Sequence, residues 1–132
     1  MNAEDIGKMS VLSLAHVGDA VYELLVRTRL AEKGFSTVVG LHRETVALVK
    51  APAQARAAAV LLPRLTEQEH AVYRRGRNSH VNSVPRGASK AEYHAATALE
   101  AVFGWLHLAG EDRRVHELFD AILESCFKEQ EN

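Results

Sequence analysis

The stretch SLAHVGDAVYELLVRTRL, residues 13–30, decides the fold because it is the most apolar helical segment of the chain. Its large apolar residues recur three or four positions apart, which is the repeat of one face of an α-helix. Ser10 or Ser13 can cap the start of this helix, and Gly34 provides a stop after Lys33. We therefore predict a long first helix. The apolar positions at this spacing are Leu14, Val17, Val21, Leu24, Leu25 and Leu30.

Helical patterns continue outward from this stretch, and strand patterns are nearly absent. Two sequences, Thr66-Glu-Gln-Glu69 and Ser89-Lys-Ala-Glu92, have the capping-box pattern that begins a helix. The segment 76–88 is rich in Gly, Asn, Ser and Pro, so we expect a loop there. The predicted fold class is all-α. The further helices are expected over residues 41–49, from Pro52 to just before Pro63, and over 66–75, 89–108 and 112–128.

Length and composition describe an ordinary globular chain. Its 132 residues are expected to form a single domain, 1–132, because two halves would be too small to bury good cores. No apolar run approaches the roughly 20 residues that cross a bilayer, and the polar, acidic start does not resemble a secretory signal. The only cysteine, Cys126, excludes an internal disulfide. These features predict a cytoplasmic protein.

Charge is distributed unevenly along the chain, although the net charge is only −1. Residues 27–90 contain twelve Lys or Arg and four acids, whereas residues 111–132 contain seven acids and three bases. One surface could therefore be positive and bind a polyanion. Ordinary solvated helix faces explain the totals equally well.

Asp19 fits the first helix least well, because it lies in the middle of the apolar sequence. A buried carboxylate costs on the order of several kcal/mol unless it is paired, hydrogen-bonded or bound to metal. Gly18 beside it is also unfavourable in mid-helix unless another backbone or a ligand comes close. His16 and Glu23 share this face of the helix. Pairing of Asp19 and Glu23 with a base such as Arg27 is the alternative, and spacing alone slightly favours it.

Glu100 repeats this pattern, as the only acid in YHAATALEAVFGWLHL, residues 93–108, with Gly104 one turn later. Two acids close to glycines in two apolar helices suggest that these helices cross closely and present Asp19 and Glu100 to one cation. Mg²⁺ suits such a site because it takes oxygen ligands and is often held by one or two carboxylates. Mn²⁺ is expected to substitute for it. Such a cation can activate water and stabilise the leaving oxygen in phosphodiester hydrolysis.

A basic stretch without a single acid runs from His70 to Ala91. Arginines at a helix end and on a glycine-rich loop can bind phosphates through two parallel hydrogen bonds. Neighbouring Asn and Ser side chains can reach a 2′-hydroxyl. The alternative is a solvated helix end whose arginines interact with the helix dipole. We favour phosphate binding, and the candidate RNA-binding residues are Arg74, Arg75, Arg77, Asn78, Arg86 and Lys90.

Motifs for several other chemistries are missing from the sequence. The seven histidines are scattered, with no HExxH motif and no cysteine pair, so a zinc site is not expected. The sequence also contains no P-loop, GxGxxG or GxSxG motif. Nucleotide binding and hydrolase-elbow chemistry are therefore not supported.

Three segments, taken together, resemble a known family. SLAHVGDAVYELLVRTRL resembles the ribonuclease III helix that contains a Gly-Asp-Ala motif. RRGRNS followed by VP, and then ATALEAVFGWLHLAG, resemble the small variant called Mini-ribonuclease III. The similarity runs from about Met9 to Phe119, with the motifs in the family's order. By position, the Asp of the first motif is Asp19 and the Glu of the later helix is Glu100.

This resemblance implies a homodimeric ribonuclease III catalytic domain that lacks the usual double-stranded-RNA-binding domain. Members of the family cut both strands of an RNA duplex and leave 5′-phosphate and 3′-hydroxyl ends. The established role of the small variant is maturation of the bacterial 23S ribosomal RNA precursor, and a ribosomal protein is a candidate partner. Asp19 and Glu100 are then the catalytic, metal-binding residues.

The chain departs from full-length ribonuclease III at several acids. Leu12 and Ala15 occupy positions of two further acids, and Thr97 occupies the position of an aspartate; the small variant resembles this chain in lacking all three. Fewer carboxylates imply weaker metal binding and more reliance on RNA phosphates. His16 stands where the small variant usually has an aromatic residue, and Glu23 matches one of its acids. Both are candidate supporting residues only.

Two other functions remain open from the sequence. The chain could be a non-catalytic RNA-binding or ribosome-associated module on the same fold, or a helical dimer that binds only protein. The presence of both Asp19 and Glu100 in their helical settings favours the nuclease.

Overall fold

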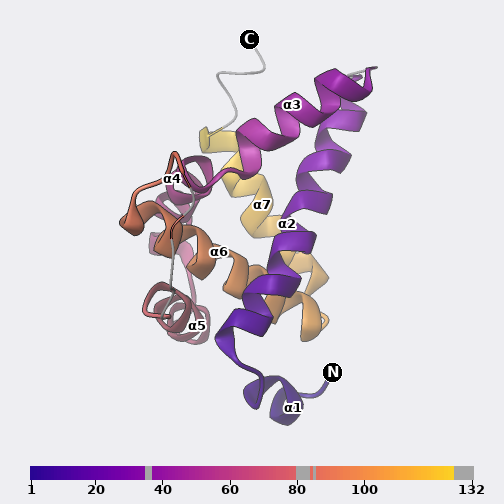
Figure 1. Ribbon diagram of the computed structural model, residues 1–132. Coiled ribbons are helices and arrows are strands. Elements are labelled where there is room, and N and C mark those ends of the chain that lie inside the picture. Colours follow the sequence, from indigo (N-terminus) through magenta and orange to yellow (C-terminus); the bar gives the residue numbers. More distant parts are fainter. Residues whose placement is uncertain (35–36, 80–83, 85, 127–132) are drawn as a thin grey trace.

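All regular elements of the computed structural model, which describes residues 1–34, 37–79, 84 and 86–126, are helices (Figure 1). The all-α prediction is confirmed. The elements are α1 (Ala3–Gly7), α2 (Val11–Glu32), α3 (Val38–Val49), α4 (Ala51–Leu61), the short 3₁₀ helix η1 (Leu62–Arg64), α5 (Glu67–Arg77), α6 (Lys90–Leu108) and α7 (Asp112–Cys126).

Local capping signals set the ends of several helices where the sequence predicts them. The Ser10 hydroxyl accepts a hydrogen bond from the backbone N–H of Ser13 at 3.1 Å and so caps α2. Thr66 and Ser89 each begin a reciprocal capping box, at α5 and α6 respectively. Gly34, after α2, has a φ of 88°, a left-handed conformation that glycine adopts without steric cost.

The structure differs from the predicted helices at three places. The short helix α1 was not predicted; the Asn2 side chain caps it by accepting from the N–H of Asp5 at 2.8 Å. Helix α3 begins at Val38 rather than near residue 41, because Thr37 caps it. Helix α5 continues to Arg77 instead of ending near residue 75. Residues 80–83 and 85 of the predicted loop, and residues 127 and 128 of the last helix, lie outside the described residues.

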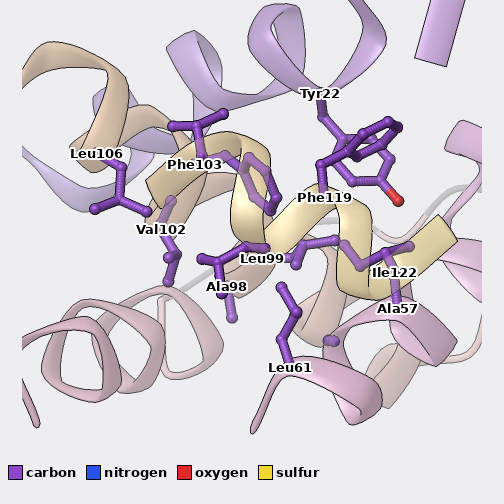
Figure 2. Close-up of a cluster of buried hydrophobic side chains, with 14 of the residues drawn as sticks. Tyr22, Ala57, Leu61, Ala98, Leu99, Val102, Phe103, Leu106, Phe119 and Ile122 are labelled. Atoms are coloured by element: carbon purple, nitrogen blue, oxygen red, sulfur yellow. The ribbon is translucent and has the colours of Figure 1, made fainter. Parts of the chain in front are cut away.

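Helix α6 lies at the centre of the fold and packs against α2, α4, α5 and α7. Its buried side chains meet those of the neighbouring helices in one hydrophobic cluster (Figure 2). The Tyr22 ring of α2 packs edge-on against Phe103 of α6 and Phe119 of α7, with ring centroids 5.4 and 5.7 Å apart. A core centred on one helix therefore fixes the neighbouring helices relative to α6.

Gly76 explains why α5 can lie so close to α6. A Cβ atom at this position would come 2.7 Å from the Cα atom of Ala98 and 3.2 Å from the Cβ atom of Ala101. The composition of residues 76–88 predicts a loop at Gly76, whereas Gly76 is buried inside α5. Its small size serves helix packing here, not a turn.

No single helix in the described residues is long and apolar enough to cross a membrane. The bent pair formed by α3 and the segment 51–64 reaches that length and apolarity only when its two parts are taken together.

Candidate active site

Helices α2 and α6 cross at a pair of glycines, and this crossing brings Asp19 and Glu100 together. A Cβ atom on Gly18 would lie 1.6 Å from the carbonyl oxygen of Glu100, and one on Gly104 would lie 1.9 Å from that of Leu14. No larger residue fits at either position without moving a helix. The predicted close crossing of the two helices is confirmed.

The two carboxylates differ in their surroundings. Asp19 is exposed, and Glu100 is partly buried. Burial, the negative charge of Asp19 and a hydrogen bond with the Asp19 carboxyl raise the pKa of Glu100 to about 8, and a hydrogen bond from Gln54 opposes this rise. The expectation that Asp19 is a buried acid is wrong, because Asp19 is exposed on α2, where it lines a cavity. Of the two carboxylates, Glu100 is the one that is partly buried.

A cavity of about 590 Å³ contains both acids. Its wall combines the carboxylates with exposed basic side chains, Lys50 and Arg86, and with the aromatic ring of Tyr93. Such a cavity can take a phosphate chain beside a cation. The lining residues are Asp19, Val49, Lys50, Ala51, Pro52, Gln54, Arg86, Gly87, Ala88, Tyr93, Ala96 and Glu100.

Gln54, Lys50 and Tyr93 line the cavity but were not identified from the sequence. Gln54 has the clearest signal that was overlooked. Only 2% of it is exposed, and it lies one turn before Ala57 and Ala58 on the buried face of α4. Gln54 is a polar residue within the apolar pattern of an alanine-rich helix, just as Asp19 is an acid within an apolar helix.

Glu23 and His16, the candidate supporting residues, lie outside the cavity lining. Glu23 forms an ion pair with Arg27 at 3.4 Å. The alternative drawn from spacing therefore holds for Glu23 but not for Asp19, which forms no ion pair with a base in the described part of the chain. His16 is exposed on α2.

The predicted RNA-binding residues fall into two groups. Arg86 lines the cavity, and Lys90 begins α6. The others lie exposed at the C-terminal end of α5 and are not among the lining residues. There Arg75 donates to the Met9 carbonyl at 3.3 Å and Arg77 donates to the Asn78 side chain at 3.4 Å. The structure therefore brings only Arg86 of this set to the two acids.

The arrangement of the acids fits a divalent cation. Neither Asp19 nor Glu100 has an ion pair with a base in the described part of the chain, and the two carboxyl groups line the same cavity, where Asp19 raises the pKa of Glu100. Two adjacent oxygen ligands with uncompensated charge are what Mg²⁺ binds. No group of three or more His, Cys, Asp or Glu residues forms a fuller metal site among the described residues.

Comparisons with known proteins agree on one family. The ribonuclease III domain matches residues 12–111. The Mini-ribonuclease 3 of Symbiobacterium thermophilum is 48% identical over 83% of this chain and 85% of its own length, and that of Clostridium tetani is 39% identical over 98% and 89%. A crystal structure of a Fusobacterium nucleatum protein superimposes with a TM-score of 0.82 at 28% identity, covering 89% of this chain and 96% of its own. The chain therefore belongs to the ribonuclease III family of endoribonucleases, in its Mini-ribonuclease 3 branch.

Proposed function

We propose that this endoribonuclease cleaves double-stranded RNA with Asp19 and Glu100 as the catalytic carboxylates that hold Mg²⁺. The observation that carries the proposal is the pairing of these two acids in one cavity without a basic partner among the described residues. Two like charges so close together are unfavourable unless a proton or a cation is shared between them. Burial is the largest cause of the raised pKa of Glu100, and the negative charge of Asp19 raises it further.

When bound, Mg²⁺ supplies the Lewis acidity that makes water a nucleophile and stabilises the leaving oxygen of a phosphodiester. Asp19 and Glu100 provide two of its oxygen ligands, and Mn²⁺ can take its place. The remaining ligands would be waters and RNA phosphates, because Asp19 and Glu100 are the only carboxylates that the described residues contribute to the cavity. We therefore expect tighter cation binding in the presence of RNA.

The basic residues hold the RNA backbone. Lys50 and Arg86 lie in the cavity beside the acids, where they can bind phosphates next to the cleaved bond. The A-form shape of the duplex and its 2′-hydroxyls distinguish RNA from DNA. Binding is expected to weaken steeply with salt. Outside the cavity, the proposed contacts are Arg74, Arg75, Arg77, Asn78 and Lys90.

The proposed substrate is the precursor of 23S ribosomal RNA, cut in the cytoplasm to leave 5′-phosphate and 3′-hydroxyl ends. A homodimer would place one cavity against each strand of the duplex. A ribosomal protein that presents the RNA is a candidate partner. Incubation of the protein with precursor RNA, followed by mapping of both new ends, tests the substrate and the end chemistry together.

Cleavage of a duplex RNA in Mg²⁺ tests the catalytic assignment. Asp19→Asn and Glu100→Gln should each lower the rate at least about 100-fold, which corresponds to roughly 2.7 kcal/mol of transition-state stabilisation. Glu23→Gln is the matched control, since Glu23 lies on the same helix but pairs with Arg27 outside the cavity. Cleavage near the wild-type rate by either of the first two variants would refute the assignment.

A further inference from the structure

Gln54 is a deeply buried polar residue that the proposed chemistry does not yet use. Only 2% of it is exposed, and it belongs to the cavity wall together with Asp19 and Glu100. Its side-chain amide is near enough to the carboxylate of Glu100 to lower the pKa of that acid, against the effect of burial. Gln54 therefore places a buried amide of α4 in the same cavity wall as the acid on α6.

The position of Gln54 on α4 is otherwise apolar. Ala53, Ala57, Ala58 and Leu61 share the buried side of this helix, which packs against α6 and α7. Burying an amide is unfavourable unless its hydrogen bonds are replaced, and a leucine or methionine would bury as much apolar surface without that cost. The property that Gln54 adds is a neutral hydrogen-bond donor in the cavity wall that also contains Glu100.

A neutral donor differs from a basic one in its effect on a cation site. A lysine or arginine at position 54 would form an ion pair with Glu100 and cancel charge that Mg²⁺ requires. The amide fixes the carboxylate without cancelling its charge. The basic residues of the cavity, Lys50 and Arg86, are exposed and form no ion pair with Glu100 in the part of the chain that the structure describes.

We propose that Gln54 is a positioning residue. Its amide holds the Glu100 carboxylate facing Asp19, so that the two carboxylates are already arranged as ligands before a divalent cation binds. This inference rests on the proposed function, because it gives Gln54 a role toward the same cation. Residues that orient metal ligands typically change metal affinity about 10- to 100-fold when they are replaced.

Titration calorimetry of the RNA-free protein with Mn²⁺ tests this role without relying on activity. Gln54→Met keeps the side-chain length and removes the donor, and we expect its Mn²⁺ dissociation constant to rise at least about tenfold with an unchanged or higher melting temperature. Gln68→Met is the matched control, since Gln68 is exposed on α5. In duplex cleavage, Gln54→Met should raise the half-saturating Mg²⁺ concentration by a similar factor and leave the rate at saturating Mg²⁺ within a few-fold of wild type.

The outcomes separate the two proposals. Wild-type affinity for Mn²⁺ in a folded Gln54→Met variant would overturn the positioning role alone, and a lowered melting temperature with unchanged affinity would show a packing role instead. If the wild-type protein binds no Mn²⁺, or if Asp19→Asn does not remove the binding, the proposed function itself is contradicted, whatever the role of Gln54. If Gln54→Met does not fold, Gln54→Asn takes its place, because it keeps the amide but shortens the side chain. An unchanged Mn²⁺ affinity of Gln54→Asn would equally contradict the positioning role.

Discussion

Gly18 controls the distance between the two acids, although it has no side chain of its own. A Cβ atom there would overlap the Glu100 carbonyl oxygen at 1.6 Å, so Gly18→Ala must push α2 away from α6. We expect a loss of about 1–3 kcal/mol in the free energy of unfolding, together with a loss of cleavage activity. Urea unfolding and duplex cleavage measure the two effects. Gly7→Ala is the control, because its Cβ atom meets nothing within 4 Å; equal stability of both variants would contradict the close crossing.

Glu100 should make the metal-free protein less stable as pH rises. Its pKa is about 8 in the folded state and about 4.3 in an unfolded chain, so the folded state binds this proton more tightly. The resulting stabilisation is complete below about pH 4 and is lost between about pH 4 and pH 8. Glu100→Gln removes this dependence. After allowance for solvent screening at a partly exposed site, the variant should exceed wild type by about 1–2 kcal/mol at pH 9 and match it at pH 4.

Urea unfolding in the presence of a chelator at both pH values measures this difference. Glu23→Gln is the control, because its carboxylate is ion-paired with Arg27 and should give no gain at pH 9. Parallel pH profiles for wild type and Glu100→Gln would show that Glu100 titrates normally in the folded protein.

The pair of acids is predictable from the sequence, but the side chains that surround them are not. The glycines beside Asp19 and Glu100 predict a close crossing because only glycine permits one, so that inference follows from side-chain size alone. Helical periodicity, in contrast, says which residues share a face and not which neighbour covers it. Periodicity therefore predicts a buried Asp19, and it does not identify Gln54, which lines the same cavity as Glu100 from a position 46 residues away in the sequence.

Helices α5 and α7 are joined by an ion pair between Glu69 and Arg114 that is held by two hydrogen bonds. Arg114 donates through Nε and Nη2 to the two carboxylate oxygens of Glu69, both at 2.9 Å, and Nη2 also donates to the Arg64 carbonyl. Glu69 is 3% exposed and also closes the capping box with Thr66. Arg114→Met leaves this carboxylate buried without its base, and we expect a loss of about 3 kcal/mol in unfolding free energy. Chemical denaturation of the variant at pH 7 measures it.

The control for this contact is Glu117→Gln. Glu117 also binds Arg114, at 3.2 Å, but its side chain is 53% exposed, so its loss should cost less than about 1 kcal/mol. Burial raises the pKa of Glu69, but hydrogen bonds from Arg114 and Thr66 outweigh it and hold the pKa below its ordinary value. The stability that the contact provides is therefore present at neutral pH and lost as the pH falls below about 4. Equal losses in Arg114→Met and Glu117→Gln would contradict this account.

Helix ends were predictable to the extent that they depend on local signals. Both capping boxes are found where the sequence places them, because each requires only four consecutive residues. The end of α5 was not predictable in this way. Glycine is a residue type typical of turns, so the local sequence favours an end of the helix at Gly76. Only the packing of Gly76 against Ala98 of α6 explains why the helix continues. Tertiary packing overrides the local preference there.

Four residues of α2 form an exposed ladder, meaning a row of side chains along one face of the helix that contains no Asp, Glu, Lys or Arg. Its members lie four residues apart and are all exposed: Leu12, His16, Ala20 and Leu24. Leu12 is 48% exposed and Leu24 is 65% exposed, although the sequence pattern grouped Leu24 with the apolar face. Large apolar side chains in such a row are typical of an interface. The proposed homodimer would cover them, and the ladder runs directly beside Asp19.

His16→Glu tests the assembly because it puts a carboxylate in the middle of this ladder. In a symmetric dimer the same surface is used by both subunits, so each new charge would be buried against apolar side chains or face its own copy. We expect wild type to sediment as a dimer and His16→Glu to sediment as a monomer at micromolar concentration, in analytical ultracentrifugation. His107→Glu makes the same change at an exposed site in the last turn of α6, which is not part of the ladder, and should remain dimeric. A dimeric His16→Glu protein would place the interface elsewhere, whereas a monomeric wild type would contradict the homodimer itself.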